Sequence, residues 1–531
     1  MTHRILIADP IDPSGLEILE ASGAEVRKVS AEERPRLAEV LPGYDALVVR
    51  SATRVTAELL AAADGLKVVG RAGIGVDNVD VAAATERGIL VVNAPTANVV
   101  SATEHTFAML LALARKVPRA HASLSGGAWD RKSWVGLELQ GKTLGVVGFG
   151  RIGQRVAARA RAFEMAVLAF DPFLDPAVAR KLDVELLPLA EVLSRSDVVT
   201  LHTPLTDQTR DLIGAGELAT MKPGALLVNC GRGGVVDEAA LLAALDEGRL
   251  AGAALDVFAE EPPSDFTLMR HPKVVVTPHI GAQTREAQER IATETARMVL
   301  AALDGSLAVT AVNLPFAATG TRGEPWLSLG EQIGRLAGSL FDRGLSRVEV
   351  DLWGIDEALR RPLSVAAVKG ALTPVVGEAV NFVNAERVAE QRGVEVVAST
   401  HSRAADYPQM VGVTLEGGGE SVELAGTLFA ERDPRVVRFA GFRLEFRPSG
   451  TLLVLRNADV PGVVGRLGTI LGEAGVNIAD IHLARRDGES DAMAVLRLDE
   501  TPPEAVLDRL RALPEVRSAR VLELGGPPRP G

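Results

Sequence analysis

Short apolar runs rich in Val, Ile and Leu alternate with Ala/Leu/Glu-rich helical segments through the N-terminal part of the chain. This alternation is typical of parallel strands joined by helices. Two series can be separated, and the six strands of the second suit a doubly wound sheet. The predicted strands of the first series are 4–8, 46–50, 67–70 and 89–93. Those of the second series are 144–148, 167–170, 198–201, 226–229, 253–257 and 274–277. The pattern predicts an α/β protein with two Rossmann-like, doubly wound parallel-sheet domains.

Longer helical patterns follow each series. A helix is predicted over 101–117, with Ser101 as its N-cap and Glu104 at the capping-box position. A second helix is predicted over 284–303, and the Gly-, Pro- and Thr-bearing stretch 304–325 is typical of a linker. The remaining third has a different texture and predicts two smaller α+β domains. The terminal 525–531, rich in Gly and Pro, is expected to be a disordered tail.

Composition narrows the class of protein. A chain of 531 residues is too long to fold around one hydrophobic core, and its 47% hydrophobic residues are enough to fill several cores. A net charge of -12 argues against a general nucleic-acid or anionic-membrane surface. Cys230 is the single cysteine, so we expect neither an intrachain disulfide nor a cysteine-based metal site. The chain also has no long apolar segment, and we expect a reducing, cytoplasmic setting.

A glycine-rich turn follows the first strand of the second series. Gly148-Phe-Gly150-Arg-Ile-Gly153 ends that strand and opens a helix. In a βαβ unit such glycines allow a tight turn, close approach of a pyrophosphate and tight helix–strand packing. The next strand ends in Asp171, which could bind ribose hydroxyls and would repel a 2′-phosphate, so NAD is favoured over NADP. The alternative is a purely structural turn, with Asp171 starting the turn before Pro172.

Three polar segments stand at predicted C-terminal strand ends, where an open α/β sheet builds its site. They contain Arg232, Glu261 and His279. Hydride transfer at a secondary alcohol needs a group that takes the hydroxyl proton, which suits imidazole. A guanidinium can bind a substrate carboxylate with two hydrogen bonds. Taken singly, each residue could instead be a surface ion pair, a solvated loop charge or a cap.

These motifs, in this order, resemble the D-isomer-specific 2-hydroxyacid dehydrogenase family over about residues 3–313. The resemblance implies that Arg232 assists substrate binding, that Glu261 supports His279, and that His279 donates and accepts the proton. It also implies further cofactor contacts at matching positions. These are Arg151, Ile152, Thr203, Cys230, Asp256, Gly281 and Ala282.

The segments 50–56 and 70–78 resemble the substrate loops of the family's phosphoglycerate-oxidising members. By this resemblance Arg50 and Arg71 would meet a phosphate, which needs cationic partners. The same comparison suggests substrate contacts at Gly75 and Asn98, and a basic patch at Arg131 and Lys132 that could reach a neighbouring subunit. The alternatives are solvated loop charges at the arginines and a dimer contact made by the loop around Trp129.

Residues 455–479 resemble an ACT regulatory domain, in which Asp459 and Asn477 would hold an L-serine effector. Asn457 departs from the tyrosine found in some relatives, and a simple assembly module is the alternative. Residues 318–447 resemble an intervening domain, in which relatives can bind substrate or anions. A role as a structural spacer is an equally open alternative. The implied division is a substrate-binding domain (1–97 and 283–314), an NAD-binding domain (98–282), the intervening domain (318–447) and the ACT domain (451–524).

The resemblance therefore implies NAD-dependent oxidation of 3-phospho-D-glycerate to 3-phosphooxypyruvate, the first step from glycolysis to L-serine, in a homodimer or homotetramer. One alternative is another D-2-hydroxyacid dehydrogenase, such as a hydroxypyruvate/glyoxylate or 2-hydroxyglutarate-linked reductase. A second is a non-enzymatic, NAD-sensing scaffold.

Overall fold

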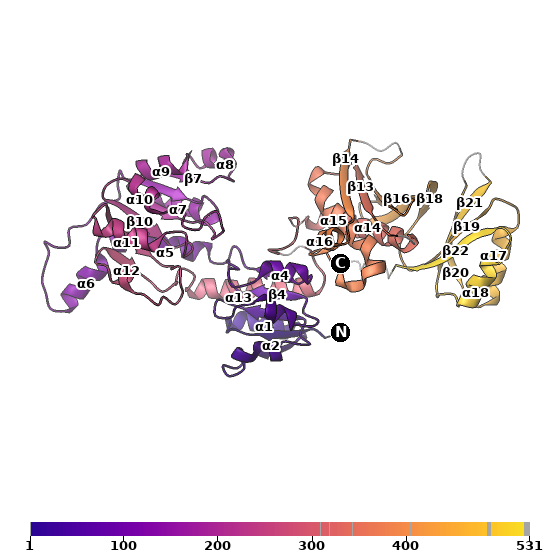
Figure 1. Ribbon diagram of the computed structural model, residues 1–531, viewed down its shortest axis with the longest axis horizontal. Helices are drawn as coiled ribbons and strands as arrows, with labels where there is room; N and C mark the ends of the chain where they lie inside the picture. Colours follow the sequence, from indigo (N-terminus) through magenta and orange to yellow (C-terminus); the bar gives the residue numbers. More distant parts are fainter. Residues whose placement is uncertain are drawn as a thin grey trace.

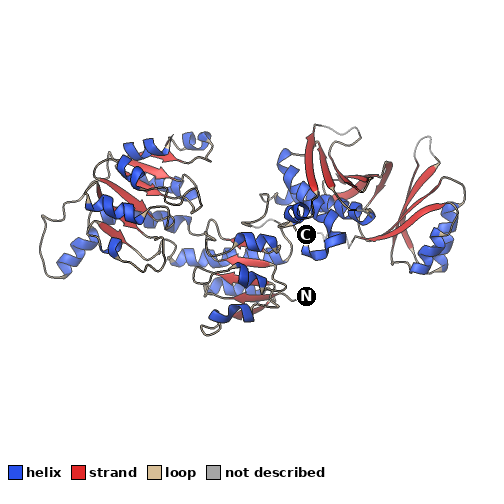
Figure 2. Cartoon of the chain, in the orientation of Figure 1, coloured by secondary structure: helices blue, strands red, loops and turns tan. Residues whose placement is uncertain are grey.

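A computed structural model describes residues 2–307, 310–317, 319–341, 344–402, 406–485 and 490–524. Its strands form four sheets, and along the elongated molecule these lie in the order second, first, third and fourth (Figure 1). The two N-terminal sheets are parallel and carry helices on both faces, whereas the two C-terminal sheets are largely antiparallel and carry helices on one face (Figure 2). The predicted fold class is confirmed. The expected disordered tail, 525–531, lies outside the described residues.

The first sheet has five parallel strands in the order β2-β1-β3-β4-β5. Helix α13 (Arg285–Leu303) returns from far along the sequence to cover it. A Cβ on Gly70 of β4 would contact Val299 of α13 at 2.5 Å, which shows how closely helix and sheet approach. The other elements are β1 (Arg4–Ile7), α1 (Pro13–Ala21), β2 (Glu25–Lys28), α2 (Leu37–Val40), β3 (Ala46–Val49), α3 (Ala57–Ala61), β4 (Val68–Arg71), α4 (Val81–Glu86) and β5 (Leu90–Asn93).

The second sheet has seven parallel strands in the order β12-β11-β10-β9-β6-β7-β8. The strand order reverses between β6 and β9, and ligands of open α/β sheets bind at such a switch point. Its strands are β6 (Thr143–Val147), β7 (Ala166–Phe170), β8 (Glu185–Leu186), β9 (Val198–Leu201), β10 (Ala225–Asn229), β11 (Leu250–Leu255) and β12 (Val274–Val276). Its helices are α5 (Val99–Ala114), α6 (Val117–Ser125), α7 (Arg151–Ala162), α8 (Pro176–Lys181), α9 (Leu189–Arg195), α10 (Ala215–Thr220), α11 (Glu238–Asp246) and α12 (Thr267–Arg270).

The third unit packs two long helices on a six-stranded sheet of order β14-β13-β15-β16-β17-β18. Helices α14 and α15 touch along glycines: a Cβ on Gly334, Gly338 or Gly370 would collide with the backbone of the facing helix. The elements are α14 (Gly320–Leu340), β13 (Arg347–Trp353), α15 (Arg360–Val376), α16 (Ala385–Gln391), β14 (Glu395–His401), β15 (Met410–Gly417), β16 (Glu420–Phe429), β17 (Asp433–Phe439) and β18 (Phe442–Phe446).

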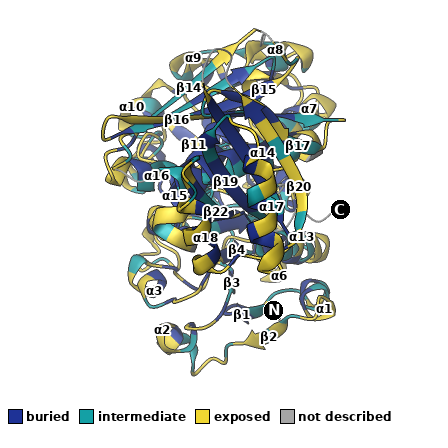
Figure 3. Ribbon diagram, turned by 90° about the vertical axis from the view of Figure 1, so that its right-hand side faces the viewer, coloured by how far each residue is buried: buried dark blue, intermediate teal, exposed yellow. Residues whose placement is uncertain are grey.

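The fourth unit is an antiparallel sheet of order β20-β21-β19-β22 with two helices. Its strand residues Leu452, Val454 and Val495 belong to the same apolar core as Phe439 and Phe446 of the third unit. The two C-terminal units therefore share a core, and Figure 3 shows the buried strand β19 behind α17 and α18, whose outer faces are exposed. The elements are β19 (Thr451–Ala458), α17 (Val463–Glu473), β20 (Ile478–Arg485), β21 (Asp491–Leu498), α18 (Glu504–Arg511) and β22 (Val516–Glu523).

The third unit also contacts the first. Asn381 Nδ2 donates to the Gly88 carbonyl at 2.7 Å, and Arg387 forms an ion pair with Glu86. Gly88 lies in the turn between α4 and β5, with a φ of 68°, and a Cβ there would contact the Asn384 amide at 2.8 Å. The turn is thus held by a unit some three hundred positions further along the chain.

Two local predictions were wrong. Helix α5 begins at Val99 rather than Ser101, its N-cap is Asn98, and the Ser101 hydroxyl donates back to the Asn98 carbonyl. The chain then breaks at Lys116, with a left-handed φ of 53°, and starts α6. The stretch expected as a linker is partly ordered, because Ala311 pairs with Val92 and α14 begins at Gly320. Among the described residues, no helix is long and apolar enough to cross a membrane.

Candidate active site

The glycine turn after β6 has the geometry that its sequence predicts. Gly148 has a φ of 90°, and a Cβ there would lie 2.7 Å from the His202 carbonyl. A Cβ on Gly153 would collide with the Gly148 carbonyl, so this glycine allows tight helix–strand packing. A Cβ on Gly150 would meet nothing within 4 Å, and α7 starts there without a side-chain cap. An open approach and free helix amides suit a pyrophosphate; Arg151 and Ile152 open the same helix.

Asp171 is fixed beside this turn. Its two oxygens accept hydrogen bonds from the backbone N–H groups of Phe149, at 2.9 Å, and Phe173, at 3.0 Å. Each oxygen keeps a lone pair for a further donor. The carboxylate thus stands at the end of β7, next to the glycines, where a ribose would need an acceptor.

Further buried polar atoms lie at the ends of the neighbouring strands. The Thr203 hydroxyl and the side-chain amide oxygen Oδ1 of Asn98 are buried without a hydrogen-bond partner among the described residues. Burial raises the pKa of the Cys230 thiol, which is therefore neutral, and lowers the pKa of His202 to about 4. Unpaired buried acceptors are costly unless a ligand pairs with them. Together with the open glycine turn and Asp171, they fit a dinucleotide.

A buried carboxylate, Asp256, organises the loop after β12. Asp256 is 1% exposed and accepts hydrogen bonds from the Thr277 hydroxyl at 2.6 Å and from the N–H groups of Ile280 and Gly281, both at 2.9 Å. Burial raises its pKa, but the hydrogen bonds from His105, Thr277 and Ile280 outweigh burial and the net pKa is lowered. The ionised carboxylate therefore holds the Gly281–Ala282 turn in place.

This loop presents His279 in a strained backbone conformation. His279 has a φ of 54°, in the left-handed region that non-glycine residues rarely adopt, and its N–H donates to the Asp256 carbonyl at 2.8 Å. Strain of this kind, of order 1–3 kcal/mol, persists only where the surroundings hold the residue. The loop thus fixes the position from which the imidazole extends.

His279 and Glu261 form the predicted pair. His279 Nδ1 lies 2.6 Å from Glu261 Oε2, and Glu261 Oε1 accepts from the Phe258 N–H at 3.0 Å. Burial raises the Glu261 pKa, but the hydrogen bonds from His279 and Phe258 outweigh it, and the net pKa is lowered. The pair leaves His279 Nε2 available, on a side chain that is 45% exposed. Both residues line a cavity of about 380 Å³ whose other walls include Phe258, Phe266 and Val276.

Three arginines lie close together where the two parallel-sheet units meet, a place referred to below as the cleft: Arg50 and Arg71 come from the first unit and Arg232 from the second. Burial first, and then the charges of Arg232 and Arg50, lower the pKa of Arg71 to about 10, which leaves its guanidinium charged at neutral pH. Arg232 donates from Nη1 to the Gly231 carbonyl at 2.7 Å and from Nε to Asp77 at 3.1 Å. A Cβ on Gly75 would collide with the Arg232 guanidinium. The cleft is therefore electropositive and suited to an anion.

The residues that hold these arginines were not found from the sequence. Asn78 Nδ2 donates to the carbonyls of Arg50 and Thr53, each at 2.6 Å, and Asp9 accepts from the Arg50 N–H at 2.7 Å. Asp77 pairs with Arg232. The signal was present for two of them, since Asp77 and Asn78 belong to the same glycine-rich loop as Gly75.

Four predicted residues lie away from this cleft. Arg131 and Lys132 are exposed in the loop after α6, which Figure 1 shows on the far side of its unit from the first sheet. In the fourth unit, Asp459 pairs with Arg485 at 3.2 Å and Asn477 donates to Asp499 at 2.6 Å. Asp459 and Asn477 thus have their partners within their own unit.

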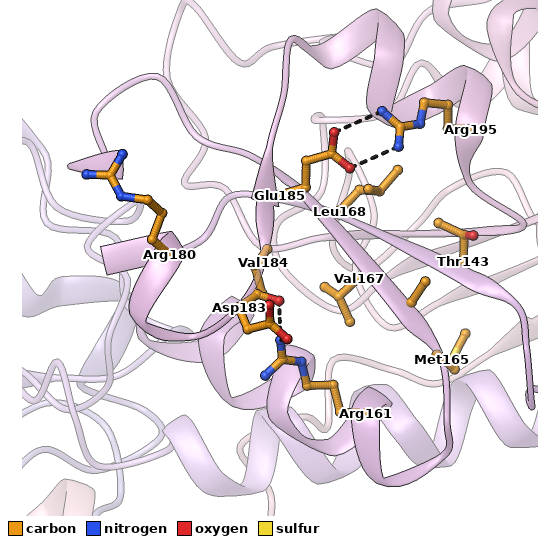
Figure 4. A pocket seen from close by; sticks show the side chains of 11 residues that line it. Thr143, Arg161, Met165, Val167, Leu168, Arg180, Asp183, Val184, Glu185 and Arg195 are labelled. Carbon is orange, nitrogen blue, oxygen red and sulfur yellow. Dashed lines mark hydrogen bonds and ion pairs between the residues drawn. The ribbon is translucent and has the colours of Figure 1, made fainter. Parts of the chain in front are cut away.

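A larger cavity, of about 830 Å³, opens at the N-terminal ends of β6 and β7, opposite the glycine turn. Figure 4 shows two ion pairs among its charged side chains: Arg195 with Glu185 at 2.9 Å and Arg161 with Asp183 at 2.8 Å. None of the predicted site residues lines it. Size alone is thus a poor guide to the chemistry here, and we place the candidate site at the C-terminal strand ends.

Known proteins match the chain over almost its whole length. Residues 107–281 match the NAD binding domain of the D-isomer specific 2-hydroxyacid dehydrogenases, 323–440 the D-3-phosphoglycerate dehydrogenase intervening domain, and 451–515 the ACT domain. The D-3-phosphoglycerate dehydrogenase of Methanocaldococcus jannaschii is 40% identical over 525 residues, covering 98% of this chain and 100% of that protein. The Mycobacterium tuberculosis protein of the same name is 43% identical over 523 residues, covering 98% and 99%.

Solved structures match more than half of the chain. The TT0316 protein of Thermus thermophilus gives a TM-score of 0.54 at 40% identity and covers 58% of this chain and 99% of its own. A D-lactate dehydrogenase of Aquifex aeolicus, complexed with NAD and lactic acid, gives 0.53 at 30% identity and covers 57% and 96%. The chain therefore belongs to the D-isomer-specific 2-hydroxyacid dehydrogenases, within the family of D-3-phosphoglycerate dehydrogenases that carry an intervening domain and an ACT domain.

Proposed function

We propose that this protein oxidises 3-phospho-D-glycerate to 3-phosphooxypyruvate with NAD, as the first step from glycolysis towards L-serine. The observation that carries the proposal is that the Glu261–His279 pair and a group of three arginines all lie at the C-terminal ends of strands, or in the loops that follow them, in the two parallel sheets. A 2-hydroxy acid that also carries a phosphate has two anionic ends, and this cleft supplies more cationic groups than a single carboxylate needs.

NAD, when bound, supplies the hydride acceptor. The residues proposed to hold its pyrophosphate are Gly148, Gly150, Arg151, Ile152 and Gly153, and Asp171 would accept from the adenosine ribose. The remaining contacts are proposed at the neighbouring strand ends, where the unpaired Thr203 hydroxyl lies. They comprise Thr203, Cys230, Asp256, Gly281 and Ala282.

His279 Nε2 takes the proton of the substrate's 2-hydroxyl group in oxidation and returns it in reduction. Glu261 orients the ring through Nδ1 and stabilises the imidazolium that forms. Arg232 binds the substrate carboxylate and polarises the developing carbonyl. Arg50 and Arg71 bind the phosphate, with Gly75 and Asn98 beside them, while Arg131 and Lys132 could reach the cleft only from a second subunit.

Further proposals concern the domains of the chain, its effector and its oligomeric state. We propose the division into a substrate-binding domain (1–97 and 283–314), an NAD-binding domain (98–282), an intervening domain (318–447) and an ACT domain (451–524). L-Serine is proposed to bind near Asp459 and Asn477 in a homodimer or homotetramer. A cytoplasmic location remains a prediction from composition.

The direct test is steady-state NADH formation from 3-phosphoglycerate, glycerate, lactate and 2-hydroxyglutarate, with and without L-serine. We expect the phosphorylated acid to give the highest kcat/KM. Good turnover of another acid with none of 3-phosphoglycerate would refute the assignment and favour a different dehydrogenase of the family. His279→Ala should lower kcat by about 10²- to 10⁴-fold while NADH still binds, since general acid–base catalysis contributes that much. Unchanged turnover would remove His279 from the mechanism.

A further inference from the structure

We propose that Asp77 is a positioning residue. It holds the Arg232 guanidinium across the cleft and leaves the end formed by Nη1 and Nη2 free to bind the substrate carboxylate. The inference deepens the proposed function and rests on it for the role of Arg232. Asp77 lies in the loop between β4 and α4 of the first unit, and Arg232 lies after β10 of the second, 155 positions away. Their contact therefore joins the two units that form the cleft.

The hydrogen bonds fix the plane of the guanidinium. Arg232 Nε donates to Asp77 Oδ2 at 3.1 Å, and Nη1 donates to the Gly231 carbonyl at 2.7 Å. A guanidinium has five N–H donors in a rigid fork. With one edge held by Asp77 and one Nη1 hydrogen held by the backbone, the end formed by Nη1 and Nη2 keeps donors for a two-pronged bond to a carboxylate.

Gly75 provides the space for this arrangement. A Cβ at this position would collide with Arg232 Nη2 and would lie 2.6 Å from Asp77 Oδ2. Gly75 was expected to contact substrate, but its closest neighbours within the chain are the two members of this pair. Gly75 and Asp77 together form a seat for Arg232, on a loop that also carries Arg71 and Asn78.

The charges of the cleft give Asp77 a second reason to be there. Arg50, Arg71 and Arg232 repel one another, and Asp77 acts on Arg71 in the opposite direction from the other two arginines. Without a nearby anion, Arg232 would be driven towards solvent and away from the other cations. Asp77 is 51% exposed and Arg232 25% exposed, so the pair adds little to folding stability. Its variants are therefore expected to fold.

The experiment compares Asp77→Ala and Asp77→Asn by kcat, KM and the dissociation constant of NADH. Asparagine keeps an oxygen that can accept from Arg232 Nε, whereas alanine does not. We expect Asp77→Ala to lower kcat/KM by about ten- to a hundredfold, as small misplacements of positioning groups do. Asp77→Asn should lose clearly less, and NADH affinity should stay unchanged in both. Asp64→Asn is the matched control, because Asp64 is exposed in the same unit, away from the cleft.

A double-mutant cycle separates positioning from a general effect of charge. Lysine at 232 has no Nε donor edge, so Asp77→Ala should cause almost no further loss in an Arg232→Lys background. Losses that multiply in the double variant, or a kcat/KM of Asp77→Ala within twofold of wild type, would overturn the inference. If wild type fails on 3-phosphoglycerate, the proposed function fails, and the cycle is run on whichever hydroxy acid it oxidises. The carboxylate bound by Arg232 is common to all of them.

Discussion

Asp256 shows how much one buried carboxylate can determine at the scale of a residue. It accepts hydrogen bonds from the loop that carries His279, and it remains ionised because those bonds outweigh burial. Asp256→Asn exchanges acceptors for an amide whose N–H group would face other donors. We expect a loss of stability of about 2 kcal/mol at pH 7, the usual cost of leaving buried donors unpaired.

The pH dependence of that loss follows from the direction of the shift. The folded pKa of Asp256 is lowered, so its contribution is fully present above the ordinary aspartate pKa of about 3.9 and is lost as pH falls through the lowered value. Urea unfolding at pH 7, 5 and 3.5 should therefore show a constant difference between wild type and variant at the first two values and a smaller one at the third. A difference that grows towards acid would contradict this account.

Asp171 decides between the two nicotinamide cofactors at the same scale. Its carboxylate is held by the Phe149 and Phe173 N–H groups beside the glycine turn. Asp171→Ala removes both the ribose acceptor and the charge that repels a 2′-phosphate. We expect the ratio of kcat/KM with NAD to that with NADP to fall about tenfold or more, since each 1.4 kcal/mol changes a ratio by that factor. An unchanged ratio would exclude Asp171 from cofactor discrimination.

At the scale of elements, apolar pattern predicted the buried strands well and the edge strands poorly. β3, Ala46–Val49, is buried at every residue and was expected at nearly these limits. β2, Glu25–Lys28, was missed because an edge strand exposes polar side chains, and β8 is only two residues long. Ser101 failed as a cap because its hydroxyl bonds backwards to Asn98, an alternative that the sequence pattern leaves equally open.

The residues of the candidate site also divide into those that the sequence pattern predicted and those that it did not. His279, Glu261 and Asp171 follow buried strands and belong to motifs, so the topology of parallel strands brings them to one edge. Asp9, Asp77 and Asn78 act on other loops through contacts between positions far apart in the sequence. No local periodicity encodes such pairs, and only the packed structure reveals them.

Helix α13 offers a test of capping at the scale of one element. Thr284 accepts from the Ala287 N–H at 3.2 Å at the start of this helix, which covers the first sheet. Thr284→Ala should lower stability by about 1 kcal/mol, as loss of an N-cap does. Thr293→Ala is the control within the same helix, because its hydroxyl only bonds back to the Arg290 carbonyl. Equal urea midpoints for the two variants would argue against the cap.

At the scale of the molecule, the contact between the third unit and the α4–β5 turn is open to a direct test. Aspartate at 381 cannot donate to the Gly88 carbonyl, and glutamate at 387 would repel Glu86. We expect the Asn381→Asp/Arg387→Glu double variant to separate the two units. Small-angle X-ray scattering should then give the double variant a larger radius of gyration than wild type. The control is Arg392→Glu, which alters an exposed residue just after α16, the helix that carries Arg387, and should leave the radius unchanged. Identical scattering curves would show that other contacts hold the units together.

The core shared by the third and fourth sheets has a practical consequence for deletion experiments. Cutting the chain after β18 would leave Phe439 and Phe446 without the side chains of β19 and β21 that now cover them. Newly exposed apolar surface of this kind promotes aggregation. If such a shortened protein had altered kinetics, the cause could be damage to the third unit as much as the loss of regulation by the fourth. Point substitutions at Asp459 or Asn477 keep that core intact and are the sounder way to ask what the last unit does.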